Sequence, residues 1–197
     1  MENRELHFLA KVSDILTKDV DMSELASHLK ILLSEYVTLK TLQIYVFDNT
    51  TNTLRNCINN WSVVEEAPEI YTAFENIKEH DFVINSKAYK LPPVIGDITL
   101  KIQSLFMPIV KEEKVFGIVE LNFDKDTPVD MKFLFLMKIF AAQISLKLQN
   151  IVLNEQSKIN VEFHDSMKNI AKIIETQYEL NYIVPLIGEM LDRFISD

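Results

Sequence analysis

The sequence predicts a mixed domain of the α+β (α/β) class, with helices at both ends and β-hairpins between them. Apolar residues recur at helical spacing near the N-terminus and again over the last third of the chain. Between these regions, short apolar runs are separated by turn residues, which is typical of antiparallel strands. The length of 197 residues suits one domain with additional elements.

The chain is predicted to open with two amphipathic helices. Residues 5–18 repeat leucine at helical spacing, and residues 23–36 do the same. Asp21 or Ser23 can cap the first turn of the second helix, because a short polar side chain accepts a hydrogen bond from a free backbone N–H there. Each helix therefore has one apolar face to bury.

Two β-hairpins are predicted. The first joins residues 42–48, with the sequence LQIYVFD, to residues 53–61 through a turn rich in Asn and Thr. The second joins residues 104–110 to residues 115–122, and the tetrad KEEK at residues 111–114 forms its turn. The charges of this tetrad indicate a turn exposed to solvent.

Gly117 is one of only three glycines in the chain, and it lies inside the last of these strands. A glycine within a strand lacks a side chain to pack, and it often marks a bulge or a close approach of other atoms. We expect that a side chain at this position would crowd a packed helix or lift the strand out of line.

The middle of the chain is less regular. A short helix is predicted to begin at Pro68 and to continue through residue 78, followed by a strand over residues 81–86. Residues 91–99 contain two prolines and a glycine and are predicted to form a loop. The sequence NFDKD at residues 122–126 is expected to form a turn.

A long helix is predicted from Pro128 and Asp130 to residue 180. Its apolar residues follow the alternating spacing of four and three that is typical of a coiled-coil seam, with one shift of register. The two rows are Met137, Ala141, Ile144, Leu148 and Ile151, then Val152, Ile159, Phe163, Ile170, Ile173 and Leu180. We expect the first half to pack on its own domain and the second half to pack on a partner helix.

The chain is therefore divided into a domain of residues 1–150 and a signalling or coiled-coil helix with the start of a further module in residues 151–197. Residues 170–194 resemble residues 9–33 in their pattern of apolar positions. Such a repeat indicates that a second copy of the module begins near residue 170.

Composition excludes several classes of function. The chain has 29 acidic and 20 basic residues and a formal net charge of −9, which argues against nucleic-acid binding and against contact with anionic membranes. The single cysteine, Cys57, excludes an intramolecular disulfide and a site built of several cysteines. No apolar run reaches the ~18 residues of a membrane-spanning helix, so we expect a cytoplasmic protein.

The order of elements and the second hairpin resemble a GAF domain, the small-molecule sensor module of bacterial and eukaryotic signalling proteins. The resemblance rests on SLFMPIVKEEKVFGIVELNF at residues 104–123 and on LQIYVFDNTTNTLRNCINNW at residues 42–61. It covers about residues 6–148. A PAS domain, the nearest competing fold, does not open with two helices before the first hairpin.

The resemblance implies an antiparallel sheet of five or six strands, with the terminal helices on one face and a ligand pocket under the middle segment on the other. It also implies a homodimer through residues 6–18 and 138–180, which would pass a signal to an attached output domain. Members of this family bind cyclic nucleotides, bilins, haem or small organic molecules, and the residues of this chain specify no particular cofactor or ligand.

The pocket residues can be proposed from the alternation of side chains along each strand. Glu120 shares one strand face with Ile118 and Asn122. An unpaired polar group in an apolar strand costs about 2–7 kcal/mol, so this carboxylate needs a partner, a water molecule or a ligand. The predicted ligand-binding residues are Trp61, Tyr71, Phe74, His80, Phe82 and Glu120. These aromatic residues can equally fill the core.

No catalytic or metal site is predicted. Cys57 does not precede a histidine, as the cysteine that attaches a bilin usually does, and it is expected to be a half-buried small residue. The four histidines have no spacing that suits a metal on a helix. His164 precedes Asp165 and resembles the phosphoacceptor of sensor histidine kinases, although a solvated polar face explains the same residues.

The main hypothesis is a non-enzymatic sensory or regulatory domain that binds a small molecule and relays the signal through dimeric terminal helices. One alternative is a scaffold without a ligand, whose own aromatic residues fill the pocket and which serves for dimerisation. Another is the sensor portion of a histidine kinase, with His164 as phosphoacceptor.

Overall fold

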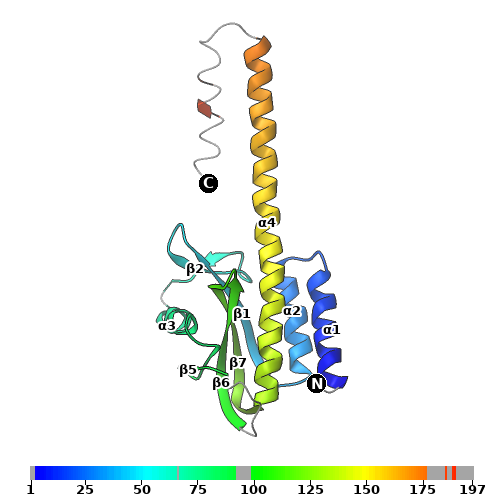
Figure 1. The fold of residues 1–197 in the computed structure, drawn as a ribbon, viewed down its shortest axis with the longest axis vertical. Coiled ribbons are helices and arrows are strands. Elements are labelled where there is room, and N and C mark those ends of the chain that lie inside the picture. The colour runs from blue at the N-terminus through cyan, green and yellow to red at the C-terminus, as the bar shows by residue number, and fades with distance from the viewer. Residues whose placement is uncertain (1–2, 66, 92–98, 177–184, 186–187, 190–197) are drawn as a thin grey trace. The chain divides into compact units, whose positions relative to one another are not determined.

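The computed structural model describes residues 3–65, 67–91, 99–176, 185 and 188–189. The chain forms two units, Met1–Gln149 and Asn150–Asp197. The sheet lies in the first unit (Figure 1). Most of the residues that were predicted to start a second module, namely 177–184, 186–187 and 190–197, lie outside the described part of the chain.

Helices stand at both ends of the first unit, as predicted, and a short helix lies between two strands in the middle of the chain. They are α1 (Asn3–Thr17), α2 (Met22–Ser34), α3 (Pro68–Ile77) and α4 (Met131–Thr176). Asp21 caps α2, because its Oδ1 accepts a hydrogen bond of 2.7 Å from the Glu24 N–H. Asp130 does the same for α4, with 2.8 Å to the Phe133 N–H.

The strands form one antiparallel sheet with the order β3-β2-β1-β7-β6-β4-β5. They are β1 (Leu39–Asp48), β2 (Thr53–Asn56), β3 (Ser62–Val63), β4 (Phe82–Ile84), β5 (Lys87–Tyr89), β6 (Thr99–Lys111) and β7 (Lys114–Asp130). The sequence predicted five or six strands, and the described residues form seven. The difference lies in β3 and β5, edge strands of two and three residues that are too short for a periodicity signal.

The two faces of the sheet are covered by different helices (Figure 1). The helices α1 and α2 and the first part of α4 lie on one face, and the short helix α3 lies on the other. Beneath α3, Tyr45, Phe106 and Ile118 of the sheet pack with Phe74 and Ile77 of the helix. Because neighbouring side chains of a strand point to opposite faces, the residues between them fill the larger core on the other side.

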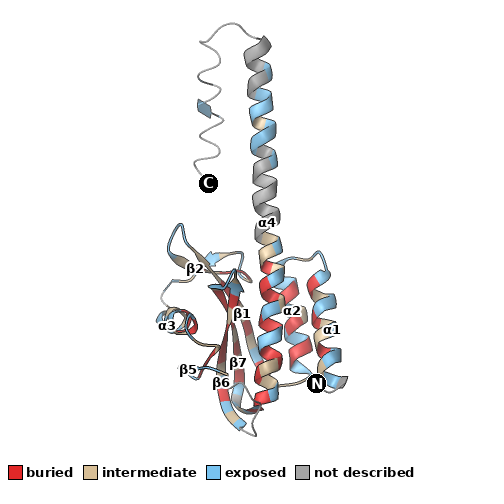
Figure 2. Cartoon of the chain, in the orientation of Figure 1, coloured by how far each residue is buried: buried red, intermediate tan, exposed pale blue. Residues whose placement is uncertain are grey.

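That larger core contains most of the buried residues (Figure 2). Phe8 of α1 and Phe140 of α4 are fully buried, and their ring centroids lie 6.2 Å apart. Met137, Ala141, Ile144 and Leu148, four residues of the first predicted seam, are also buried. The first half of α4 therefore packs on its own domain with this row, and any partner helix must use another face.

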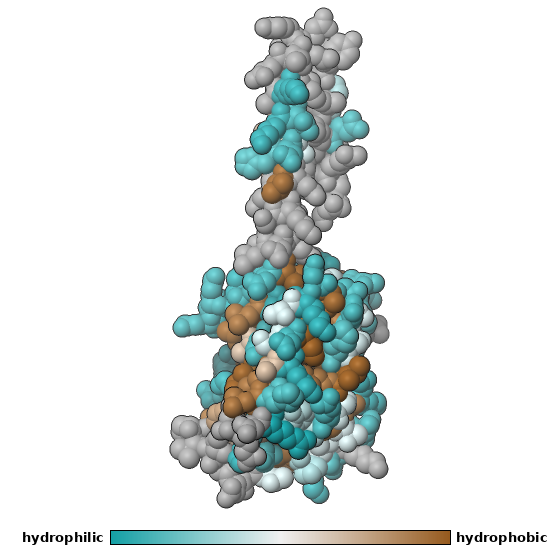
Figure 3. Space-filling model, turned by 90° about the vertical axis from the view of Figure 1, so that its right-hand side faces the viewer, coloured by the Kyte–Doolittle hydropathy of each residue, from teal (hydrophilic) through white to brown (hydrophobic). Residues whose placement is uncertain are grey.

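Other apolar side chains are left at the surface. Figure 3 views the domain from the side of α1 and α2, where apolar patches interrupt the hydrophilic surface. On α4, Ile139 is 39% exposed and Leu146 is 62% exposed, and Ala142 between them is also exposed. Ile31 of α2 is 66% exposed.

Two predicted strand boundaries are corrected. The second strand ends at Asn56, and residues 57–61 form a turn in which Asn60 and Trp61 have positive φ angles of 50° and 56°. Residues 122–126, predicted as a turn, lie within β7. The pairing of β6 with β7 shifts its register there, so the extra residues bulge without ending the strand.

Gly117 lies where two strands approach closely. A Cβ atom at this position would lie 2.3 Å from the backbone oxygen of Tyr45 and 3.3 Å from Cδ1 of Ile109. The prediction that a side chain would be crowded here is confirmed. The crowding atom belongs to the neighbouring strand β1, however, and not to a packed helix.

The charged tetrad forms the tight turn that was predicted. Lys111 pairs with Lys114, and the two residues between them, Glu112 and Glu113, have positive φ angles of 49° and 65°. Two consecutive residues of positive φ are typical of the type I′ turn, which normally favours Asn and Gly. Glutamate is an unfavourable residue in this conformation.

The helix α4 also contacts the end of β6, beyond the residues that pair with β4. The Val110 N–H donates to the Ser145 hydroxyl at 3.2 Å, and the Gln149 amide donates to the Val110 carbonyl at 2.9 Å. Both backbone groups of Val110 are therefore satisfied by side chains one helical turn apart. This contact ties the sheet to α4 at a point far along the chain from their covalent junction.

Within the described residues, no helix is long and apolar enough to cross a membrane.

Candidate functional site

The face of the sheet beneath α3 changes from apolar to polar along its strands. At one end, Tyr45 and Ile118 belong to the apolar cluster under α3. Further along, the register places Glu120 between Gln43 of β1 and Phe106 of β6. The next row places Asn122 between Thr41 and Ser104. Glu120 and Asn122 therefore lie in the centre of the sheet, on its longest strand.

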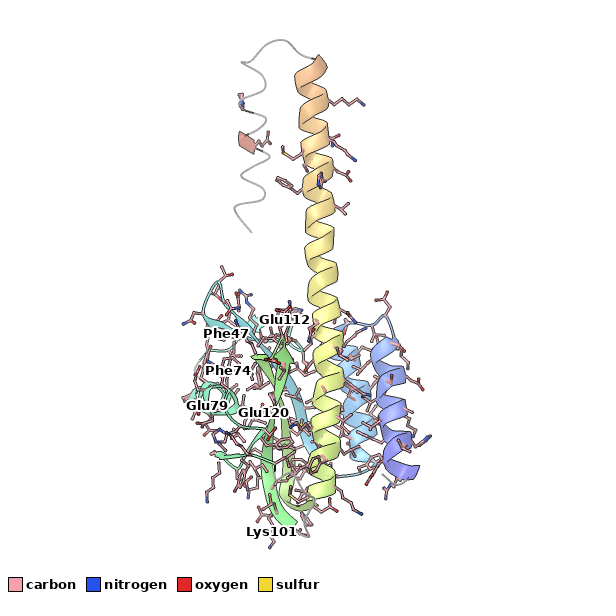
Figure 4. The ribbon with its side chains drawn as sticks, viewed as in Figure 1. Phe47, Phe74, Glu79, Lys101, Glu112 and Glu120 are labelled. Atoms are coloured by element: carbon pink, nitrogen blue, oxygen red, sulfur yellow. The ribbon has the colours of Figure 1, made fainter. Side chains whose placement is uncertain are left out.

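A cavity of about 230 Å³ lies over this polar region. We call it the α3 cavity, because one wall is the helix α3 and the floor is the sheet. Figure 4 shows Glu120 on the sheet and Phe74 on the neighbouring helix. The described residues that line the cavity are Pro68, Glu69, Thr72, Ala73, Asn76, Val83, Ser86, Ser104, Phe106, Glu120 and Asn122.

The carboxylate of Glu120 is held by two neutral donors. The Tyr45 hydroxyl donates to Glu120 Oε2 at 2.8 Å, and the Asn122 amide donates to Glu120 Oε1 at 2.9 Å. The Asn122 amide nitrogen also lies 3.1 Å from the Thr41 hydroxyl. A carboxylate has about four acceptor positions, so each oxygen keeps capacity for a further donor.

Tyr45 remains a neutral donor in this network. The pKa of Tyr45 is raised well above its ordinary value of 10.0, mainly because the phenol is buried. The negative charge of Glu120 and the hydrogen bond between Tyr45 and Glu120 raise this pKa further. A second negative charge beside Glu120 would be strongly disfavoured. The phenol is therefore fixed as a hydrogen-bond donor over the physiological pH range.

Two of the predicted site residues, Tyr71 and Phe74, hold α3 against the sheet. The Tyr71 hydroxyl accepts from the Leu54 N–H and donates to the Val64 carbonyl, both at 3.1 Å. Phe74 is buried and stacks on Phe47 with ring centroids 5.0 Å apart. Neither is among the described residues that line the cavity, and both act on it by positioning its wall.

The remaining predicted residues are dispersed. Trp61 is half-buried in the turn after β2. His80 lies beyond the end of α3, and its Nδ1 lies 2.8 Å from the Asn76 carbonyl oxygen, which can only accept, so Nδ1 carries the proton. Phe82 is fully buried. Because Val83 belongs to the cluster beneath α3, its neighbour Phe82 points to the opposite face. Of the six predicted residues, Glu120 alone is among the described residues that line the cavity.

Sequence reasoning missed several residues of the site. Ser104 and Thr72 contribute hydroxyl groups to the lining, and Tyr45 supplies the donor to Glu120. The helical spacing of residue 72 with Pro68 and Asn76 is a signal that could have found it, since all three lie on one face of α3. Tyr45 gave no such signal, because its contact depends on the pairing of two distant strands.

A second set of contacts connects the α3 region to α4. Asp81 follows α3 in the chain, and its Oδ1 lies 2.5 Å from Nζ of Lys138. Burial opposes the charge of Asp81, but the hydrogen bonds from Lys138 and from the Leu91 N–H outweigh burial and hold the pKa of this carboxyl below its ordinary value. This ion pair joins the segment that follows α3 to α4.

The single thiol is inert. Cys57 is buried, and this burial raises the pKa of its thiol to about 12. Among the described residues, no group of three or more His, Cys, Asp or Glu side chains could hold a metal ion. In the second unit, His164 and Asp165 are exposed on α4.

Comparison with known proteins identifies the fold. No family model matches the sequence, and no curated protein matches it. The GAF domain of a phosphoenolpyruvate-protein phosphotransferase from Acinetobacter has a TM-score of 0.52 at 14% identity, covering 76% of this chain and 95% of that chain. The corresponding domain from Coxiella burnetii has a TM-score of 0.56 at 10% identity, covering 77% and 96%.

The fold is that of a GAF domain. A segment of a methyl-accepting chemotaxis protein is also similar, with a TM-score of 0.51 at 13% identity, covering 72% of this chain and 97% of that segment. Identities this low carry the fold alone. In this chain the α3 cavity lies on the face of the sheet opposite to α1 and α2.

Proposed function

We propose that this GAF domain is a non-enzymatic, cytoplasmic sensory or regulatory module. It binds a small molecule in the α3 cavity and relays the occupancy of the cavity through α4. The observation that carries the proposal is the position of Glu120 and Asn122 on β7. The strand β7 leads directly into α4, so the floor of the cavity and the proposed output helix are one continuous segment.

Two further contacts support the relay. The Asp81–Lys138 ion pair connects the segment after α3 to α4, and the hydrogen bonds of Val110 with Ser145 and Gln149 connect β6 to α4. Both β6 and β7 contribute to the cavity floor. A ligand that shifts α3 or these strands thereby changes the preferred position of α4, which is a shift between two packed states.

We further propose that the chain acts as a homodimer through α4. The exposed residues Ile139, Ala142 and Leu146 alternate by three and four, as a coiled-coil seam requires. Met167, which is 46% exposed, lies three heptads beyond Leu146 in the sequence. The row that begins at Met137 is buried in the domain itself, so this exposed row is the proposed contact with a partner helix.

The α3 cavity favours ligand binding over a scaffold without a ligand, because the aromatic residues that the structure describes leave this space unfilled. The phosphoacceptor alternative requires an exposed histidine, and His164 meets that requirement. It is separable from the sensory proposal, since His164→Ala would abolish phosphotransfer in the full-length protein without altering the cavity.

Native mass spectrometry of the purified chain tests the proposal, because it reports the oligomeric state and any retained small molecule together. We expect a dimer that Leu146→Glu converts to a monomer. Ile31→Glu is the matched control: it places the same charge at a similarly exposed residue of α2, away from the seam. A monomeric unaltered chain, or a dimer that Leu146→Glu leaves intact, would contradict the dimeric relay.

A further inference from the structure

The described residues that line the α3 cavity carry negative charge only. Glu69 and Glu120 contribute two carboxylates, and the described lining residues include no lysine, arginine or histidine. An anionic ligand would therefore lose its hydration and face two like charges. In a partly enclosed space, where charges are screened less than in water, this arrangement disfavours anions and favours cations.

The charge of Glu120 has no cationic partner among the residues that the structure describes. Its two hydrogen-bond donors, Tyr45 and Asn122, are neutral. Lys11, Arg55, Lys78 and Lys138 each form an ion pair with another carboxylate, and none of these pairs involves Glu120. The donors orient the carboxylate and leave its net charge for a ligand to neutralise.

The N-terminus of α3 does not provide an anion site that would compete with this reading. Free N–H groups at a helix start often bind anions, but Pro68 has no N–H. The N–H groups of Ile70 and Tyr71 both donate to the Ala67 carbonyl, at 3.0 and 3.4 Å. Glu69 adds a negative charge to the same turn, where it complements the helix dipole.

The rest of the lining limits the size and character of the ligand. Ala73, Val83 and Phe106 provide an apolar surface, while Thr72 and Ser104 provide hydroxyl groups. The volume of about 230 Å³ is below the roughly 300–1,000 Å³ of sites for drug-sized molecules. The occupant therefore combines one charged group with a small apolar body.

We infer that the α3 cavity binds a small primary amine in its ammonium form, with the ammonium group on the Glu120 carboxylate and the apolar body against Phe106. This inference rests on the proposed function, since it names the class of molecule that the sensory site takes. An ammonium group offers three donors, which suits the remaining acceptor positions of Glu120 and the neighbouring hydroxyl groups.

Three probes of nearly equal size test the inference: benzylammonium, benzyl alcohol and benzoate. Each is titrated into the isotope-labelled full chain at neutral pH, and binding is followed by amide chemical shifts of α3 and β7. We expect benzylammonium to bind at least roughly tenfold more tightly than the alcohol, and benzoate to bind least. Preferential binding of benzoate or benzyl alcohol at this site, or binding of none of the three, would overturn the inference.

The comparison of the three probes is made on the unaltered chain. The variant Glu120→Gln provides a second, independent test. Glutamine keeps the size of the side chain and an acceptor for Tyr45 but removes the charge, so the preference for benzylammonium should fall roughly tenfold. Glu79→Gln is the matched control, because Glu79 is an exposed residue beyond α3 (Figure 4) and is not among the described lining residues. An undiminished preference in folded Glu120→Gln would contradict the inference.

Failure of the ligand class and failure of the proposed function can be told apart. If native mass spectrometry reveals a retained acidic or neutral molecule that shifts the resonances of α3 and β7, the sensory function stands and the ammonium class is wrong. If benzylammonium binds but the exchange rates of α4 do not respond, the ligand class stands and the relay is wrong.

Discussion

The Tyr45 phenol donates a 2.8 Å hydrogen bond to the Glu120 carboxylate from the neighbouring strand. Glu120 pairs directly with Gln43, so the contact runs diagonally across the two central strands β1 and β7. The Glu120 carboxylate lies on a partly apolar face of the sheet and therefore needs a hydrogen-bond donor, which Tyr45 supplies. It satisfies one oxygen without neutralising the charge, which is the property on which the proposed site depends.

Tyr45→Phe tests that bond. The substitution keeps the ring in the cluster beneath α3 but removes one donor to a charged acceptor, so the free energy of unfolding should fall by about 1.5–3 kcal/mol. Tyr36→Phe is the control, because the Tyr36 hydroxyl donates to the Arg4 carbonyl at an exposed position. Chemical denaturation measures both variants, and equal losses would contradict the special role of Tyr45.

Gly117→Ala should destabilise the chain severely. The added Cβ would lie 2.3 Å from the Tyr45 carbonyl oxygen, which is backbone and cannot rotate away. Forced shifts of this kind cost typically about 1–3 kcal/mol, occasionally more. Gly188 has no atom within 4 Å of such a Cβ, so Gly188→Ala provides the control. A thermal unfolding midpoint unchanged by Gly117→Ala would show that the strands separate easily at this point.

The turn between β6 and β7 offers a stabilising change. Glu112 and Glu113 both occupy the left-handed region, where residues other than glycine are disfavoured by roughly 1–2 kcal/mol each. The double substitution Glu112→Asn and Glu113→Gly introduces the pair that a type I′ turn favours. We expect a gain of about 1–2 kcal/mol in urea denaturation, and a loss of stability would mean that the two glutamates make compensating contacts.

Asp81 predicts a dependence of stability on pH. The pKa of its carboxyl is lowered in the folded chain, so the ionised form stabilises the fold above the ordinary pKa of 3.8, and this contribution disappears as the pH falls below that value. The difference in melting temperature between the unaltered chain and Asp81→Asn should therefore be constant near neutrality and shrink below about pH 4. Glu79→Gln, which removes an exposed carboxylate, provides the baseline. A difference in melting temperature that grows as the pH falls would contradict the prediction that ionised Asp81 stabilises the fold.

The sequence predicted the class of the fold and the strand face that Glu120 shares with Asn122 for physical reasons. Alternation along a long strand assigns Glu120 and Asn122 to one face, whatever the neighbouring strands are. The partner of Glu120 could not be predicted in the same way, because Tyr45 meets it only in one particular register of β1 on β7. Register depends on the packing of whole faces and on turn geometry.

Phe82 illustrates a second limit. Its strand, β4, has three residues, and all three are buried. A strand this short shows no alternation between polar and apolar residues, so the sequence does not reveal which side chains point toward the cavity. A shift by one residue exchanges the two faces of a strand, and in the structure Val83, the neighbour of Phe82, lies on the cavity side.

The central claim is that filling the α3 cavity alters α4, and a covalent probe tests it without knowledge of the ligand. Ser104→Cys places a thiol in the cavity lining, where methyl methanethiosulfonate can attach a small group. Cys57 can stay, because its thiol has a pKa of about 12 and is buried. Ser62→Cys, at an exposed residue of the edge strand β3, carries the same modification as a control.

The measurement is hydrogen–deuterium exchange across residues 131–149, before and after modification of each variant. We predict that modification at residue 104 changes the exchange rates of this part of α4 several-fold, together with those of α3, and that modification at residue 62 leaves both unchanged. If α3 responds while residues 131–149 exchange at the same rate, the cavity is not coupled to α4 and the account is contradicted.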